Sequence, residues 1–167
     1  MDQKTGTVPA VKRLIWFTDE SRTVEGNGAA VYGQFLGRGL SISLGKHATV
    51  FQVEVYAILP CVHEIETHGR PEKYVSVCSG SQAAVKALQA AKVTSPLVRQ
   101  CQKALNDISY RHAVGLYWVP GHAGARINGI ADRLARDDFV HRFVGPEPLL
   151  GVSRLNIRRM IKGWMEN

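Results

Sequence analysis

The fold of this chain is most strongly constrained by a change in how its apolar residues are spaced, from short runs to a repeat of three or four positions. Short apolar runs separated by glycine-containing segments predict three strands, Leu14–Thr18, Gly28–Tyr32 and Gly39–Leu44, joined as an antiparallel meander. From Thr49 on, apolar residues recur every three or four positions, which is typical of a helix with one apolar face. A meander followed by alternating strands and helices predicts an α/β fold with a mixed sheet covered on both faces.

Helices and strands alternate through the rest of the chain. Thr49 is the predicted N-cap of the first helix and Gly69 its stop. Pro60 is expected to kink this helix, because proline removes the hydrogen bond to the carbonyl of Tyr56. The remaining predicted elements are strands at Tyr74–Cys78 and Val114–Val119 and helices at Ser81–Ala91, Pro96–Ile108, Ile127–Ala135 and Leu155–Trp164.

Length and charge indicate one domain with a basic end. A chain of 167 residues fits a single domain, which we place at residues 11–140, between an N-terminal tail (1–10) and a linker with a basic C-terminal helix (141–167). The net charge is +7, and residues 99–167 hold eleven Lys or Arg against six Asp or Glu. Polyanions such as nucleic acids are therefore expected partners, although a basic surface also serves solubility alone.

Several classes of protein do not fit the sequence. No apolar run approaches the roughly 18 residues of a membrane-spanning helix, and the N-terminus lacks the apolar core of a signal peptide. Cys61, Cys78 and Cys101 are widely spaced and fit neither a zinc knuckle nor a disulfide framework. We therefore expect an intracellular protein, in the nucleus or the cytoplasm, that is monomeric and has no membrane partner.

Three carboxylates lie where apolar side chains are expected. Asp19 ends the first strand, Glu54 lies beside the apolar face of the first helix, and Asp132 interrupts the apolar pattern of a later helix. Taken singly, each is more readily explained as a turn, cap or salt-bridge residue, and Arg136 follows Asp132 by one helical turn. Strand ends and helix starts, however, converge at one edge of an open sheet, where three acids repel one another unless cations neutralise them. Hard oxygen ligands of this kind suit Mg²⁺ or Mn²⁺.

Five segments around these acids occur in the order found in a known family. They are Phe17–Ser21, Phe51–Ile58, Ser79–Ala84, Trp118–Gly124 and Asn128–Ala135. On these motifs the chain resembles a type 1 ribonuclease H domain, especially the version carried by insect non-LTR retrotransposons. The resemblance covers about Leu14–Arg136, which is most of the chain.

The resemblance implies a fold, a reaction and the residues that perform it. The fold would be a ribonuclease H-like, five-stranded mixed sheet of order 3-2-1-4-5 flanked by helices, followed here by a C-terminal helix. The reaction would be cleavage of the RNA strand of an RNA–DNA hybrid with two Mg²⁺ or Mn²⁺ ions. Asp19 would bridge both metals, Glu54 would bind the leaving-group metal and Asp132 the metal that activates water. His122 would shuttle a proton or assist product release.

Four further residues are expected to contact the nucleic acid. Ser81 and Gln82 would lie at a helix start that faces the minor groove, where the helix N-terminus and the amide meet phosphate or 2′-hydroxyl groups. We also expect Asn27 and Arg126 to bind nucleic acid.

One position departs from the family pattern. Gly80 stands where the family has a metal-binding aspartate, and glycine has no side chain with which to coordinate a cation. Ser79 or Ser81 would replace that ligand only weakly. Its loss would slow cleavage on the order of 10²–10⁴-fold.

Three functions therefore stay open. We expect a domain that binds RNA–DNA hybrids and whose cleavage is strongly impaired. The alternatives are an active ribonuclease H with a weakened metal site and a protein-interaction module derived from a retroelement. The last alternative rests on Leu155, Met160 and Trp164 of the C-terminal helix, for which packing against the domain is the simpler expectation.

Overall fold

The computed structural model of the chain describes residues 14–22, 26–33, 38–67, 73–93, 95–120, 150 and 154–165. The helix predicted at 127–135 and the helix stop predicted at Gly69 lie outside these ranges. Every other predicted strand and helix is present, although the first predicted helix is divided in two. In chain order the elements are β1 (Leu14–Arg22), β2 (Asn27–Gly33), β3 (Arg38–Ser43), α1 (Val50–Tyr56), α2 (Ile58–Thr67), β4 (Tyr74–Ser79), α3 (Gln82–Gln89), α4 (Pro96–Ser109), β5 (Ala113–Trp118) and α6 (Arg154–Met165).

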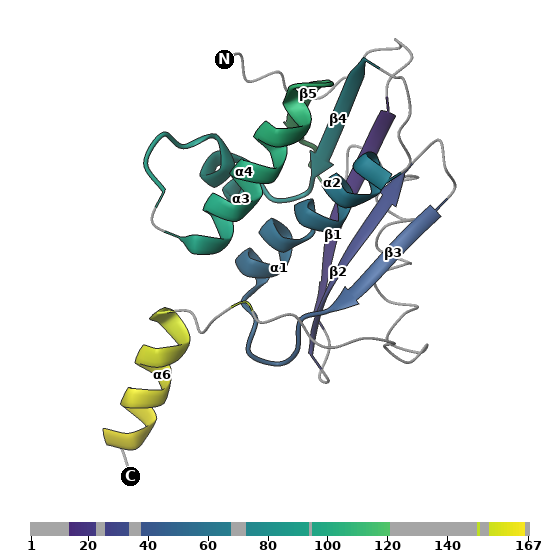
Figure 1. Cartoon of the computed structure of the whole chain (residues 1–167). Coiled ribbons are helices and arrows are strands. Elements are labelled where there is room, and N and C mark those ends of the chain that lie inside the picture. The colour runs from purple at the N-terminus through teal and green to yellow at the C-terminus, as the bar shows by residue number, and fades with distance from the viewer. Residues whose placement is uncertain are drawn as a thin grey trace.

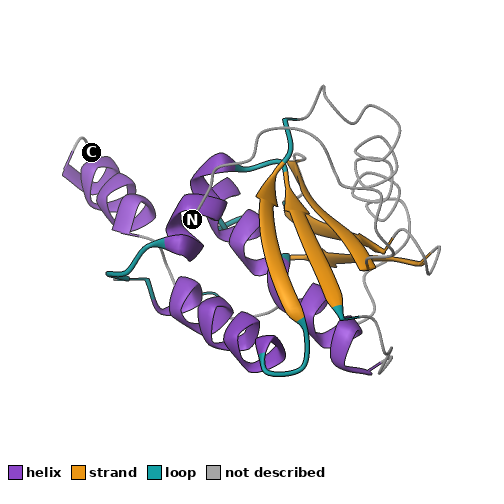
Figure 2. Ribbon diagram, turned by 90° about the horizontal axis from the view of Figure 1, so that it is seen from above, coloured by secondary structure: helices purple, strands orange, loops and turns teal. Residues whose placement is uncertain are grey.

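The five described strands form one mixed sheet in the order β3-β2-β1-β4-β5 (Figure 1). β1 pairs antiparallel with β2 and parallel with β4, while β2 pairs antiparallel with β3 and β4 pairs parallel with β5. The helices α1 to α4 gather on one face of the sheet (Figure 2). The predicted meander and the strand order implied by the resemblance are therefore confirmed.

β1 is longer than the sequence predicts. The apolar run predicts a strand that ends at Thr18, whereas β1 continues to Arg22. β2 supports this extension, because the residues from Asp19 onward pair with its antiparallel residues 27–30. β4 pairs with β1 only as far as Thr18. Asp19 therefore lies inside β1, and β4, the other strand that pairs with β1, ends at its level.

The central strand is buried on both faces, as its continuous apolar run predicts. Leu14, Trp16 and Phe17 are all buried, although successive side chains of a strand point to opposite faces. The ring of Trp16 covers Gly33 of β2, where a Cβ atom would lie 3.0 Å from the ring. The glycine thus lets the largest buried side chain approach the neighbouring strand.

The helical segment after β3 is divided into α1 and α2. It begins at Thr49, as predicted: the Thr49 hydroxyl accepts from the backbone N–H of Gln52, and the Gln52 side chain accepts from the backbone N–H of Thr49. Pro60 lies in the first turn of α2, where no backbone N–H has a partner within the helix. The helical run is therefore interrupted at Ala57, next to the Tyr56 carbonyl that Pro60 cannot bond, and a kink stays a prediction.

The C-terminal helix α6 is exposed over its described side chains, residues 157–165. Ile157 is 42% exposed and Trp164 is 83% exposed. Figure 1 shows the helix extending away from the sheet. The expectation that this helix packs against the domain is therefore wrong for the residues described. None of the described helices combines the length and the apolar content that crossing a membrane requires.

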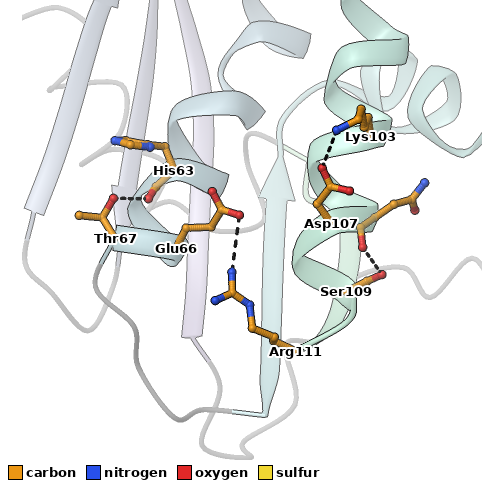
Figure 3. A network of polar contacts seen from close by, with 8 residues as sticks. His63, Glu66, Thr67, Lys103, Asp107, Ser109 and Arg111 are labelled. Atoms are coloured by element: carbon orange, nitrogen blue, oxygen red, sulfur yellow. Dashed lines mark hydrogen bonds and ion pairs between the residues drawn. The ribbon is translucent and has the colours of Figure 1, made fainter.

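We call the end of the sheet where β4 and β5 begin the amino edge, and exposed ion pairs lie on the helices α2 and α4 that lead to it (Figure 3). Arg111, just before β5, contacts Glu66 of α2 at 3.7 Å, and Lys103 contacts Asp107 one turn further along α4 at 3.0 Å. The Thr67 hydroxyl donates to the carbonyl of His63 at 2.8 Å. We call the opposite end, where β4 and β5 finish, the carboxyl edge.

Candidate metal and nucleic-acid site

The carboxyl edge brings Asp19 next to Gly80. Thr18 of β1 pairs with Ser79 of β4, so the residues that follow them lie side by side. A Cβ atom on Gly80 would lie 3.9 Å from Oδ1 of Asp19, with no closer atom among the described residues beyond its chain neighbours. Gly80 has no positive φ angle, so a side chain would not strain the backbone. The position where the resemblance expects an aspartate thus has room for a Cβ atom, which would lie in van der Waals contact with Asp19.

Glu54 reaches the same edge from α1, which packs against β1 and β2. It is 5% exposed, which is rare for a glutamate. Its Oε2 atom accepts a hydrogen bond from the Ser79 hydroxyl at 3.3 Å. Since Ser79 is the last residue of β4, this contact ties Glu54 to the strand end that carries Gly80. Asp19 and Glu54, two of the three predicted acids, are therefore brought to one edge.

Burial and nearby negative charge disfavour the ionised form of Glu54. Its pKa is raised from 4.5 to about 8, first by burial and then by the charges of Asp19 and Glu20. The hydrogen bond from Ser79 acts in the opposite direction, because a hydroxyl donor stabilises the carboxylate. In this setting the carboxyl group holds its proton at neutral pH unless a cation offsets the charge around it.

The turn from β4 into α3 is held by contacts that need no carboxylate at position 80. The indole N–H of Trp118 donates to the carbonyl of Gly80 at 3.1 Å. The N–H of Val119 donates to the carbonyl of Ser79 at 3.0 Å, and the N–H of Ser81 donates to the Ser79 hydroxyl at 3.2 Å. The backbone at Gly80 is therefore held by the end of β5 and by a hydrogen bond within the turn.

The helix α3 starts beside this turn with two of the predicted nucleic-acid-binding residues. The Ser81 hydroxyl caps the helix by accepting from the N–H of Ala84 at 3.2 Å. Gln82, the first helical residue, is exposed. Asn27, in contrast, is buried at the start of β2, where its amide donates to the carbonyl of Ala48. The contacts of Ser81 and Asn27 described here are structural, and binding of nucleic acid by all three residues stays a prediction.

The remaining predicted site residues, Asp132, His122 and Arg126, lie outside the described residues. Their roles in metal binding, proton transfer and nucleic-acid binding stay predictions. Within the described ranges, no group of three or more His, Cys, Asp or Glu side chains is arranged to hold a metal ion. The described part of the site therefore offers two carboxylates, those of Asp19 and Glu54.

The donors at the carboxyl edge fit a divalent cation. Carboxylate oxygens are the ligands that Mg²⁺ and Mn²⁺ prefer. The pKa of Glu54 is raised first by burial and then by the charges of Asp19 and Glu20, and a cation beside the carboxylate would favour its ionised form. Burial raises the pKa of the nearby Cys78 thiol to about 12, so this thiol does not compete as a thiolate ligand. Asp19 and Glu54 are the residues that would hold the cation.

An apolar groove lies elsewhere, between α2 and α4. It has a volume of about 580 Å³ and is lined mainly by apolar side chains such as Leu59, Pro60 and Leu97. None of the described residues that line it is an Asp or Glu, so they offer no carboxylate ligand for a hard cation. The carboxyl edge, and not this groove, is the candidate site.

The sequence did not reveal three contributors to the site. Ser79 donates to Glu54, Glu20 adds a second negative charge beside it, and Trp118 holds the carbonyl of Gly80. A polar residue that ends an otherwise apolar strand is the signal that points to Ser79. No signal points to the contact of Trp118, because it depends on how the β4–α3 turn meets β5.

Comparison with known proteins agrees with the topology of the sheet. The model of the RNase H family matches residues 11–139 of the chain. The search of curated proteins found no match to the chain. The matched range is well over half of the sequence and contains Asp19, Glu54 and Gly80. The chain therefore belongs to the RNase H family.

Proposed function

We propose that this chain binds RNA–DNA hybrids at the carboxyl edge and that its cleavage of the RNA strand is strongly impaired. Membership of the RNase H family supports hybrid binding. The net charge of +7 supports it as well, because basic side chains attract the phosphate backbone. An origin in a retrotransposon of the insect non-LTR type belongs to the same proposal and rests on the motifs around Glu54, Gly80 and Asp132.

The observation that carries the impairment is the geometry at position 80. A side chain there would begin 3.9 Å from Oδ1 of Asp19, yet glycine supplies no ligand atom. A cation at this edge would therefore have Asp19 and Glu54 as its described carboxylate ligands and would complete its coordination with water. Negative charge that develops on the leaving oxygen is then less well offset, which raises the barrier of the reaction.

The chain's own residues would divide the chemistry among them. When bound, divalent cations would activate a water molecule and stabilise the leaving oxygen. Asp19 and Glu54 would hold the cation at the leaving-group side. In the proposal, Asp132 serves the water-activating side and His122 transfers a proton, as the resemblance implies.

The decisive experiment compares the wild-type chain with Gly80→Asp on a labelled RNA–DNA hybrid in Mg²⁺ and in Mn²⁺. We expect the substitution to raise the cleavage rate at least tenfold, or about 1.4 kcal/mol. Gly80→Asn is the matched control, because it has almost the same shape but no charge, and it should leave the rate near that of the wild type. Equal and robust rates for wild type and Gly80→Asp would favour the alternative of an active enzyme and contradict the impairment.

Hybrid binding is tested separately, in EDTA, so that it does not depend on cations at the site. We expect the affinity to fall steeply as salt is raised, because phosphate contacts release counterions. A flat salt dependence would contradict binding through the basic surface.

The exposed helix α6 favours a second candidate function, a protein-interaction module derived from a retroelement. Ile157, Ile161 and Trp164 recur at helical spacing, and each is at least 42% exposed. Replacing these three side chains by serine should leave hybrid affinity unchanged if the helix serves a protein partner. A loss of hybrid affinity in that variant would instead assign α6 to nucleic-acid binding.

A further inference from the structure

Ser79 is a fully buried serine whose hydroxyl connects two parts of the carboxyl edge. Its exposed fraction is 0%. The hydroxyl oxygen accepts from the N–H of Ser81 at 3.2 Å and donates to Oε2 of Glu54 at 3.3 Å. A serine hydroxyl has a single proton. The hydroxyl thus accepts the Ser81 N–H with a lone pair and donates its one proton to Glu54.

We propose that Ser79 is a positioning residue: its hydroxyl, oriented by the N–H of Ser81, holds the Glu54 carboxylate in the conformation that presents it to a divalent cation. The inference rests on the proposed function, because the cation site is part of that proposal. Ser79 acts through Glu54 and touches neither the cation nor the hybrid. Its effect is therefore on cation affinity.

Glu54 needs such a partner more than a shorter acid would. A glutamate side chain has three rotatable bonds, and burying it in one conformation costs rotamer entropy. Among the described residues, Ser79 is the hydrogen-bond donor to this carboxylate. A single donor on Oε2 leaves Oε1 to bind a cation. Partners of this kind typically change metal affinity by about 10–100-fold when they are removed.

The neighbouring Ser76 provides a matched control. It lies in the same strand, β4, and is 3% exposed, so replacing it by alanine also removes a buried hydroxyl. It has no hydrogen bond to a carboxylate among the described residues. A loss of stability common to both alanine variants therefore reports burial, whereas a difference in cation affinity reports the contact with Glu54.

The experiment measures Mn²⁺ affinity by the paramagnetic resonance signal of the free ion. It uses the full chain as wild type, Ser79→Ala, Ser79→Thr and Ser76→Ala, with Glu54→Gln to identify the site. We expect Ser79→Ala to weaken Mn²⁺ binding about tenfold, Ser76→Ala to change it less than twofold, and Ser79→Thr, which keeps the hydroxyl, to retain it. The free energy of unfolding of each variant establishes that it is folded.

Three results would overturn the proposal. The first is equal Mn²⁺ affinity in Ser79→Ala and Ser76→Ala. The second is a folded Ser79→Thr protein that has lost as much affinity as Ser79→Ala. The third is a wild type whose Mn²⁺ binding is absent or survives Glu54→Gln, since Glu54 then presents no ligand. Hybrid affinity measured in EDTA stands apart from all three, so a failure here is distinguishable from a failure of hybrid binding.

Discussion

Carboxylates at the two ends of the parallel pair β4–β5 differ in burial and in the charges around them. At the amino edge, Glu66 and Asp107 lie on exposed helix surfaces beside Arg111 and Lys103 (Figure 3). At the carboxyl edge, Glu54 is buried, and the described groups that shift its pKa are two further carboxylates and a hydroxyl. Exposed acids pair with basic side chains at one edge, and at the other a buried acid lies near two further carboxylates.

This difference separates acids that serve the surface from acids that serve a site. Exposed ion pairs contribute about 0–1 kcal/mol, so they are easily gained and lost. A buried carboxylate that lies near other carboxylates destabilises the fold when it is ionised, and a strongly shifted pKa of this kind is typical of functional sites. The comparison therefore supports the proposed cation site at the carboxyl edge, and each prediction below sets a change at that edge against a control elsewhere.

The largest effect is expected from removing a carboxylate that would hold the cation. Asp19→Asn should weaken Mn²⁺ binding on the order of 10³-fold, more than the ~10–100-fold typical of outer partners. Asp107→Asn, at the amino edge, should leave it unchanged. Calorimetric titration of Mn²⁺ into both variants measures the difference, and similar losses in the two would erase the distinction between the edges.

The next effect is on the pH dependence of stability. The pKa of Glu54 is about 8 in the folded chain against 4.5 ordinarily, so the folded state holds this proton more tightly than the unfolded state does. Stability should therefore fall as pH rises from 4.5 toward 8, by about 3 kcal/mol at pH 7. Urea unfolding in EDTA measures this loss.

Glu54→Gln is the variant that tests this pH effect. It cannot ionise, so its free energy of unfolding should lose that part of the decline and exceed that of the wild type at pH 7. Parallel pH profiles for the two proteins would show that ionisation of Glu54 does not cause the loss of stability.

A smaller effect is expected at the helix start that positions Glu54. Thr49→Ala removes the capping contacts of α1 and should destabilise the chain by about 1 kcal/mol. Ser95→Ala removes the cap of α4 at similar cost. The Thr49 variant alone should also weaken Mn²⁺ binding, because α1 carries Glu54. If both caps affect Mn²⁺ affinity equally, the effect comes from general loosening of the fold.

The smallest effect is expected at the amino edge. Glu66→Gln removes the ion pair with Arg111 and should change the free energy of unfolding by less than about 0.5 kcal/mol at physiological salt. Chemical unfolding at low and at high salt measures it. A change above 1 kcal/mol would mean that the exposed pairs also matter, and the contrast between the edges would weaken.

The sequence predicts most of the sheet and helices because their signals are local. The apolar run at Leu14–Thr18 and the helical spacing after Thr49 each reflect which side chains can be buried. The length of β1 was underestimated, because the polar residues after Thr18 are held in the strand by β2 and not by their own pattern. The sequence also does not predict the exposure of Trp164, since an amphipathic helix has the same apolar pattern whether or not its apolar face is covered.

The sequence predicts the site only in part, because some of its contacts join segments that are distant in the sequence. The acids Asp19 and Glu54 stand out because carboxylates rarely occur in apolar patterns. The hydrogen bond of Ser79 and the indole contact of Trp118 depend on the register of β4 with β1 and β5, which a sequence pattern does not specify. The sequence thus predicts which residue types form the site, whereas the contacts that orient them depend on the three-dimensional fold.

Diffraction from crystals of the wild-type chain soaked in Mn²⁺, with the anomalous signal of the ion, tests the central claim most directly. We predict an ion at the carboxyl edge with oxygens of Asp19 and Glu54 about 2.1 Å away and water on the side of Gly80. An ion bound at another place, or an edge that stays free of Mn²⁺ at saturating concentration, would contradict the account.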